Sequence, residues 1–252
     1  MSSATKGAAP VAPIIAFFDV DNTLVRGASI FHLGRVAWGK RLIRLGDILT
    51  FGWHQIRFLS VGENRKHMAS ARDRALELVG GHSVKELLEL ADETYDSNIE
   101  PRLWPETIAL AREHLQKGHE VWLISATPQL IGEVIARRLG LTGALGTEIE
   151  QVDGVFTGKL IGAVLHGEEK AVAAKRLVKQ RGAHLADCWA YSDSSNDLPL
   201  LNLVGNRIAV NPDAALANYA KSHGWTILTL NKASLREARR QVRESPQITD
   251  ES

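Results

Sequence analysis

Residues 14–24 read Ile-Ile-Ala-Phe-Phe-Asp-Val-Asp-Asn-Thr-Leu, an apolar run that stops abruptly at two acids one residue apart. A short uncharged run rich in Ile and Phe is typical of a central strand that is covered on both faces. Asp19 and Asp21 would then emerge at its carboxyl end, which is the edge of a parallel α/β sheet where ligands bind. Taken alone, the pattern fits a strand followed by an Asx-turn about equally well.

A second predicted strand also ends in polar groups. Residues 120–124 read Glu-Val-Trp-Leu-Ile and lead into Ser125, Ala126 and Thr127. A hydroxyl and exposed backbone amides at a strand end, ahead of a helix, suit a phosphate oxygen. Alone, Ser125 is also typical of an ordinary helix N-cap.

Two later segments add a lysine and further acids. A predicted helix has Lys170 near its start, which is an unfavourable place for a cation unless an anion compensates the helix dipole. A third apolar strand, residues 188–192, runs into Asp193 and Asp197. Taken singly, Lys170 is about four times more typical of a solvated helix lysine. Asn196 alone is typical of a turn.

In this order, the four segments resemble the motifs of the haloacid dehalogenase (HAD) superfamily of phosphohydrolases, over about residues 14–230. One such motif is weakly specific, whereas four in sequence, each after the expected element, are highly specific. The helical insertion after the first motif and residues 192–201, Ser-Asp-Ser-Ser-Asn-Asp-Leu-Pro-Leu-Leu, look most like the phosphoserine-phosphatase-like subclass IB. The matching residues are Asp19, Asp21 and Thr23 of the Asp-x-Asp-x-Thr loop, Ser125, Lys170, Asp193 and Asp197.

The resemblance implies an α/β fold, with a Rossmann-like three-layer α/β/α core and a helical cap inserted between the first and second motifs. Residues 14–26 and 103–230 would form the core. Residues 27–102, where helical periodicity replaces strands, would form the cap. We expect a flexible N-terminus at residues 1–13 and a helix with a partly disordered tail at residues 231–252.

Local patterns predict further elements. Helices are expected at residues 65–79 and 83–95, separated by Gly80-Gly81. The turn-rich stretch 140–165 predicts a hairpin with Asp153-Gly154 at its tight turn. The remaining predicted elements are a helix at 106–117 and strands at 206–210 and 225–230.

The resemblance implies a Mg²⁺-dependent phosphomonoester hydrolase. Asp19 would be the nucleophile and form an aspartyl-phosphate. Asp21 would be the general acid toward the leaving oxygen and then the base for water. Lys170 would neutralise the phosphoryl oxygens. The implied Mg²⁺ site comprises Asp19, Asp21 through its main-chain carbonyl, Asp193 and Asp197; the implied phosphate site comprises Ser125, Ala126, Lys170 and Asn196.

The composition agrees with an enzyme and excludes several other classes. The chain has 252 residues, 44% of them hydrophobic, so it can bury a sizeable core. A formal net charge of +1 provides no global attraction to nucleic acid or an anionic membrane. Cys188 is the only cysteine and is expected to be buried, so disulfides within the chain are excluded. No run reaches transmembrane length and no signal core is present, so we expect a cytoplasmic protein.

The substrate is the least determined property. Phosphoserine phosphatases of this subclass carry a glutamate shortly after the first motif, whereas residues 25–30 contain no acid, so phosphoserine is doubtful. Arg72 and Arg74 in the cap would suit an anionic substrate group. The apolar segment 42–59 predicts packing against the core or a homodimer contact about three times more strongly than a membrane-surface helix. With Phe51 and Trp53, the same segment also permits a lipid-like phosphate.

Several functions share these residues. A small phosphomonoester is the expected partner, and phosphoserine phosphatase proper is one alternative. Phosphoryl transfer to an acceptor other than water uses the same groups. A non-catalytic HAD-fold binding protein is disfavoured, because such a protein has no chemical need for Asp21.

Overall fold

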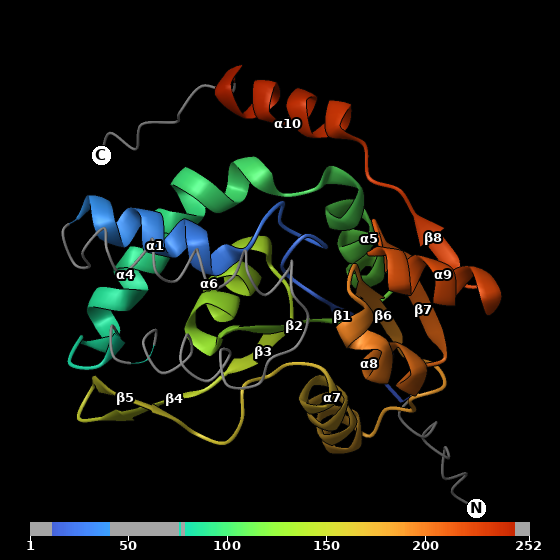
Figure 1. The fold of residues 1–252 in the computed structure, drawn as a ribbon, viewed down its shortest axis with the longest axis horizontal. Helices are drawn as coiled ribbons and strands as arrows, with labels where there is room; N and C mark the ends of the chain where they lie inside the picture. Colours follow the sequence, from blue (N-terminus) through green and yellow to red (C-terminus); the bar gives the residue numbers. More distant parts are fainter. Residues whose placement is uncertain (1–11, 41–75, 77–78, 245–252) are drawn as a thin grey trace, which may run out of the picture.

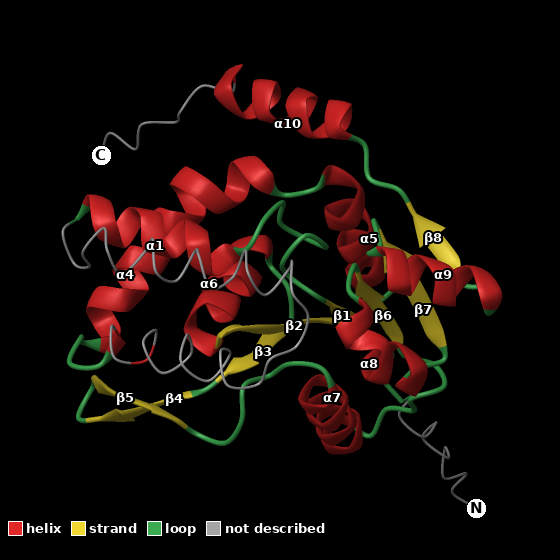
Figure 2. Cartoon of the chain, viewed as in Figure 1, coloured by secondary structure: helices red, strands yellow, loops and turns green. Residues whose placement is uncertain are grey.

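The structure, a computed structural model, describes residues 12–40, 76 and 79–244. Within this part, parallel strands form a 6-stranded sheet in the order β3-β2-β1-β6-β7-β8, and helices lie on both of its faces (Figures 1 and 2). The predicted three-layer α/β/α core is therefore confirmed. The strands of this sheet are β1 (Ile15–Phe18), β2 (Glu120–Pro128), β3 (Gly143–Thr147), β6 (Trp189–Ser192), β7 (Asn206–Val210) and β8 (Thr226–Leu228).

Strand β1 is buried on both faces, as its uncharged sequence predicts. Ala16 and Phe18 pack on the side of α5 and α6, whereas Ile15 and Phe17 pack on the side of α7, α8 and α9. This alternation follows from the two-residue period of a strand. The helices are α1 (Ser29–Gly39), α4 (Val84–Thr94), α5 (Pro105–Gln116), α6 (Gln129–Leu139), α7 (Glu168–Arg181), α8 (Leu198–Leu203), α9 (Ala214–Ser222) and α10 (Lys232–Glu244), with a π-helix at Tyr95–Ile99 and 3-10 turns at Glu100–Arg102 and Ser195–Asp197.

The predicted hairpin is present, but the stretch that contains it also holds a strand that the sequence pattern missed. Strands β4 (Ile149–Val152) and β5 (Val155–Leu160) pair antiparallel. Asp153 and Gly154 both have positive φ, 51° and 76°, which the tight turn requires. Ahead of them, β3 joins the main sheet beside β2. The predicted strand at 225–230 is shorter, Thr226–Leu228.

The described part of the cap contacts the core at several places. Helix α4, with Ser83 as its N-cap, confirms the helix predicted at residues 83–95 except at its last residue, Tyr95, which begins the π-helix. The main chain at Gly81 and His82 pairs with Phe156 of the hairpin, with N···O distances of 2.8 and 3.0 Å. On the other side, Arg137 of α6 donates to Asp92 of α4 at 2.7 Å. Of the predicted helix at 65–79, only residues 76 and 79 are described, and the segment 42–59 lies outside the described residues.

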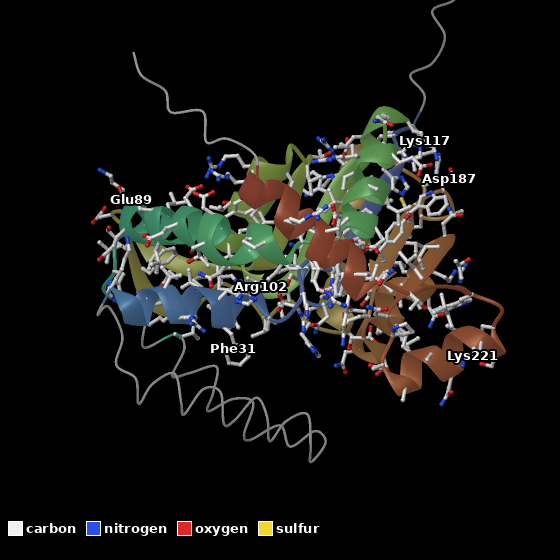
Figure 3. All side chains as sticks on the ribbon, turned by 90° about the horizontal axis from the view of Figure 1, so that it is seen from above. Phe31, Glu89, Arg102, Lys117, Asp187 and Lys221 are labelled. Atoms are coloured by element: carbon white, nitrogen blue, oxygen red, sulfur yellow. The ribbon has the colours of Figure 1, made fainter. Side chains whose placement is uncertain are left out.

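Several charged residues lie at the periphery. Glu89, Lys117, Asp187 and Lys221 are exposed and lie at the edges of the molecule in Figure 3. Among the helices that the structure describes, none combines the length and the apolar character needed to cross a bilayer.

A buried histidine lies between α5 and the sheet. His114 is 5% exposed; its Nε2 lies 2.8 Å from the hydroxyl of Tyr191, and its Nδ1 lies 2.8 Å from Nδ1 of His119. Burial, assisted by the positive charges of His119 and Lys117, lowers the pKa of His114 to about 4. Folding therefore favours the neutral imidazole.

This histidine should make the protein less stable in mild acid. Between its ordinary pKa of 6.5 and the folded value of about 4, only the unfolded chain binds the proton. The contribution of His114 to the free energy of unfolding is thus complete above pH 6.5 and is lost as the pH falls toward 4, by about 3 kcal/mol in total. Urea unfolding across this range should be less pH-dependent in His114→Gln than in the wild type. The exposed-site control His184→Gln should keep the wild-type slope; equal slopes in all three proteins would contradict the assignment.

Candidate active site

The polar strand ends predicted from the sequence meet at one edge of the sheet. Strand β1 lies between β2 and β6, with Phe18 in register with Leu123 on one side and Tyr191 on the other. The N–H of Asp19 continues this pairing by donating to the Tyr191 carbonyl at 2.9 Å. Strand β2 runs to Pro128, beyond its predicted end at Ile124, so Ser125 lies within the strand, in the stretch where its register with β3 shifts. This part of β2 and the carboxyl ends of β1 and β6 present Ser125, Asp19 and the residues after Ser192 at the same edge of the sheet.

Lys170 bridges two of these acids from the first turn of α7. Its Nζ lies 2.6 Å from Asp19 Oδ1 and 2.7 Å from Asp197 Oδ2, although 151 residues separate it from Asp19. The lysine is only 4% exposed. The hydroxyl of Ser192 also donates to Asp197, at 2.7 Å. Gly167 is the N-cap of α7, and its positive φ of 57° is a conformation that favours glycine.

The electrostatics of this cluster reflect an excess of acid. Burial raises the pKa of Asp19 well above its ordinary value; Asp197, Asp193 and Asp21 raise it further, and Lys170 opposes them. Burial alone would lower the pKa of Lys170, but Asp19 and Asp197 outweigh it and raise the value. The lysine is therefore held as a cation. Among the described residues, Lys170 is the buried cation that faces these carboxyl groups.

The loop after β1 is folded tightly over the strand end. Asn22 has a positive φ of 60°, and the N–H groups of Leu24 and Val25 both donate to the carbonyl of Val20. This turn directs the hydroxyl of Thr23 to Asp193 Oδ1 at 3.3 Å. Burial raises the pKa of Asp193 to about 7.

A chain of hydroxyl groups links the first and second motifs. Asp21 Oδ1 accepts the N–H of Ser29 at 2.8 Å. The Ser29 hydroxyl lies 2.8 Å from Thr127 Oγ1, which accepts the hydroxyl of Ser125 at 3.0 Å. Burial raises the pKa of Asp21, and the hydrogen bonds from Ser29 oppose that rise. A carboxyl group whose protonated form is favoured by burial can donate a proton.

Two expected phosphate-site residues lie at the edge of these networks. The carbonyl of Ala126 accepts the hydroxyl of Thr147 at 2.7 Å. The main-chain N–H of Asn196 donates to Ser194 Oγ at 3.2 Å. No described contact of either side chain joins it to the acids.

Ser29, Thr127 and Ser192 were not among the functional residues predicted from the sequence. Thr127 stands in the quoted strand end, but only the fold brings it to Ser29, which is 98 residues away. Ser192 directly precedes the acids of the last motif, and that position was the available signal. For Ser29, the sequence offers no signal except a hydroxyl residue shortly after the first motif.

Within the described residues, no three His, Cys, Asp or Glu side chains are already grouped as a metal-binding cluster. Asp19 and Asp197 are turned toward Lys170, and Asp193 accepts from Thr23. Any cation here would therefore need a main-chain or solvent oxygen as a further donor.

Comparison with known proteins gives concordant matches. The family model of haloacid dehalogenase-like hydrolases matches residues 16–202. The chain is 49% identical over 213 residues to phosphoserine phosphatase SerB1 of Mycobacterium tuberculosis, covering 84% of this chain and 69% of that protein. It is 32% identical over 228 residues to a histidinol-phosphatase of Neisseria meningitidis, covering 85% and 97%. A solved structure from Bordetella pertussis, of unknown function, is similar with a TM-score of 0.76 at 28% identity, covering 86% and 98%.

Proposed function

Because this chain belongs to the haloacid dehalogenase-like hydrolases and is a phosphatase of that family, we propose that it hydrolyses small phosphomonoesters through an aspartyl-phosphate on Asp19. The observation that carries this proposal is the buried Lys170, 2.6 Å from Asp19 and 2.7 Å from Asp197. A dianionic phosphate repels a carboxylate nucleophile, and a fixed cation beside the nucleophile reduces that repulsion.

In the first step, an Asp19 carboxylate oxygen forms a bond to phosphorus while the bond from phosphorus to the leaving oxygen breaks. Asp21 gives its proton to that oxygen, so the product leaves as a neutral alcohol. In the second step, Asp21 takes a proton from water, which attacks the aspartyl-phosphate. Inorganic phosphate departs, and both acids return to their starting forms.

The donor set fits Mg²⁺, which phosphatases of this family typically use. Asp19 and Asp193 offer carboxylate oxygens, and the main-chain carbonyl of Asp21 is the proposed third donor. Asp197 would be a further carboxylate of the metal site. The raised pKa values of Asp19 and Asp193 reflect burial and mutual repulsion, which a divalent cation would offset. When bound, Mg²⁺ would neutralise phosphoryl charge.

The substrate class is a small phosphorylated metabolite. The names of the relatives from M. tuberculosis and N. meningitidis make phosphoserine and histidinol phosphate the first compounds to test. Residues 25–30 contain no acid for a substrate amine. If an amine-bearing substrate is used, its amine must therefore be recognised elsewhere.

Phosphate release from a panel of phosphomonoesters, with Mg²⁺ and with chelator, tests the proposal. The panel should contain phosphoserine, histidinol phosphate, sugar phosphates and an aryl phosphate. We expect turnover that chelator abolishes and Mg²⁺ restores, because the acid cluster has one buried lysine as its cation. Asp193→Asn should raise the Mg²⁺ concentration needed for half-maximal rate by about tenfold or more. Chelator-resistant turnover would contradict the metal assignment, and added acceptor alcohols would reveal transfer products.

A further inference from the structure

Ser29 joins the cap to the proposed general acid. It is the first residue of α1, and its side chain is fully buried, with 0% exposure. Its main-chain N–H donates to Asp21 Oδ1 at 2.8 Å. Because Oδ1 is occupied as an acceptor, the transferable proton of Asp21 belongs on Oδ2.

The direction of the hydroxyl chain is set by Ser125. Thr127 Oγ1 accepts the Ser125 hydroxyl at 3.0 Å, so its own hydrogen is free for the Ser29 oxygen 2.8 Å away. The Ser29 hydroxyl hydrogen is then free to point toward Asp21, whose Oδ1 already accepts the main-chain N–H of Ser29. Ser125 and Thr127 are 3% and 5% exposed, so little water is available to replace a missing member of the chain.

We propose that Ser29 is a positioning residue for the reaction, which orients Asp21 through a hydroxyl chain that begins at Ser125. This inference rests on the proposed function, because it assigns Ser29 a role through the general acid. The chain also connects the phosphate-site hydroxyl to the acid, so both groups are held in one arrangement before the substrate reacts.

Two aryl esters of similar shape separate this role from a general structural one. Phenyl phosphate has a poor leaving group and needs protonation, whereas the leaving group of p-nitrophenyl phosphate is a more acidic phenol that needs it less. Ser29→Ala keeps the main-chain N–H but removes the hydroxyl. We expect it to lower kcat/KM, which reports phosphoryl transfer to Asp19 and not the later hydrolysis common to both esters, about tenfold for phenyl phosphate and less than about threefold for p-nitrophenyl phosphate.

Variants at Thr127 provide the matched controls. Thr127→Val should show the same selective loss with phenyl phosphate as Ser29→Ala. Thr127→Ser, which keeps the hydroxyl, should retain a near wild-type rate with both esters. Combining Ser29→Ala with Thr127→Val should add little to either single loss, because both remove the same link. Thermal unfolding identifies any variant that fails to fold, and the Thr127→Ser comparison then carries the test.

The outcomes distinguish this inference from the proposed function. Equal losses with both esters, or no loss with either, would overturn the role of Ser29 while leaving the phosphatase intact. A wild-type protein that releases phosphate from neither aryl ester nor any member of the panel would overturn the proposed function and this inference with it.

Discussion

Replacing Asp19 with Asn is expected to reduce phosphate release by about 10⁴-fold or more, at saturating substrate and Mg²⁺. The amide has no carboxylate oxygen to form the aspartyl-phosphate, Lys170 has none to offer, and the Asp21 carboxyl group is hydrogen-bonded to Ser29 as the proposed proton donor. The fold should persist because Asn has nearly the volume of Asp and Lys170 keeps its contact with Asp197, 2.7 Å away. Rapid-quench detection of a phosphoprotein that survives the acid quench and is lost in base would follow the intermediate directly.

The matched control is Asp187→Asn, a change at an exposed acid on the periphery (Figure 3). It should retain the wild-type rate and labelling. If Asp19→Asn kept wild-type turnover, the nucleophile would have to be another group, and the aspartyl-phosphate scheme would fail. If both variants lost activity equally, a general effect of removing negative charge would be the better explanation.

Replacing Lys170 with Met should both inactivate the protein and destabilise it. The lysine is buried between Asp19 and Asp197. Its removal leaves acids without their cation, at a cost of about 3–5 kcal/mol for breaking a buried charged pair. We expect urea unfolding without Mg²⁺ to reveal this loss.

Mg²⁺ should recover part of the lost stability but not the lost turnover. A divalent cation offsets the charge of the acids, whereas the phosphoryl oxygens would still lack the ammonium group. Lys221→Met, at an exposed position (Figure 3), should change the unfolding free energy by less than about 0.5 kcal/mol. A Lys170→Met protein as stable as the wild type without Mg²⁺ would contradict the electrostatic role assigned here.

Local sequence patterns were sufficient to predict most elements of the core. The buried β1, the hairpin turn at Asp153 and Gly154, and the helix that became α4 were all predicted from periodicity and turn chemistry, and the structure confirms them. Each depends on neighbouring residues alone: a strand needs a run of apolar side chains, a tight turn needs positive φ, and a helix of this kind needs an apolar period that begins after a turn.

Strand β3 shows where local patterns fail. It reads Gly-Ala-Leu-Gly-Thr and has no apolar run. A Cβ on Gly143 would lie 2.6 Å from the Trp122 ring, and one on Gly146 would lie 2.6 Å from Cα of Gln129. These glycines are therefore required by close neighbours in the folded protein. That requirement cannot be seen in the segment itself.

The sequence by itself determined the chemistry available to this protein: acids at two strand ends, a hydroxyl at a third and a lysine near the start of a helix, in the order of one family. Tertiary structure decided which of these groups meet. Lys170 reaches Asp19 across 151 residues, and Ser29 reaches Thr127 across 98. The physical reason is that residue types and local periodicity specify the elements, whereas side-chain contacts depend on how a parallel sheet brings distant strand ends to one edge.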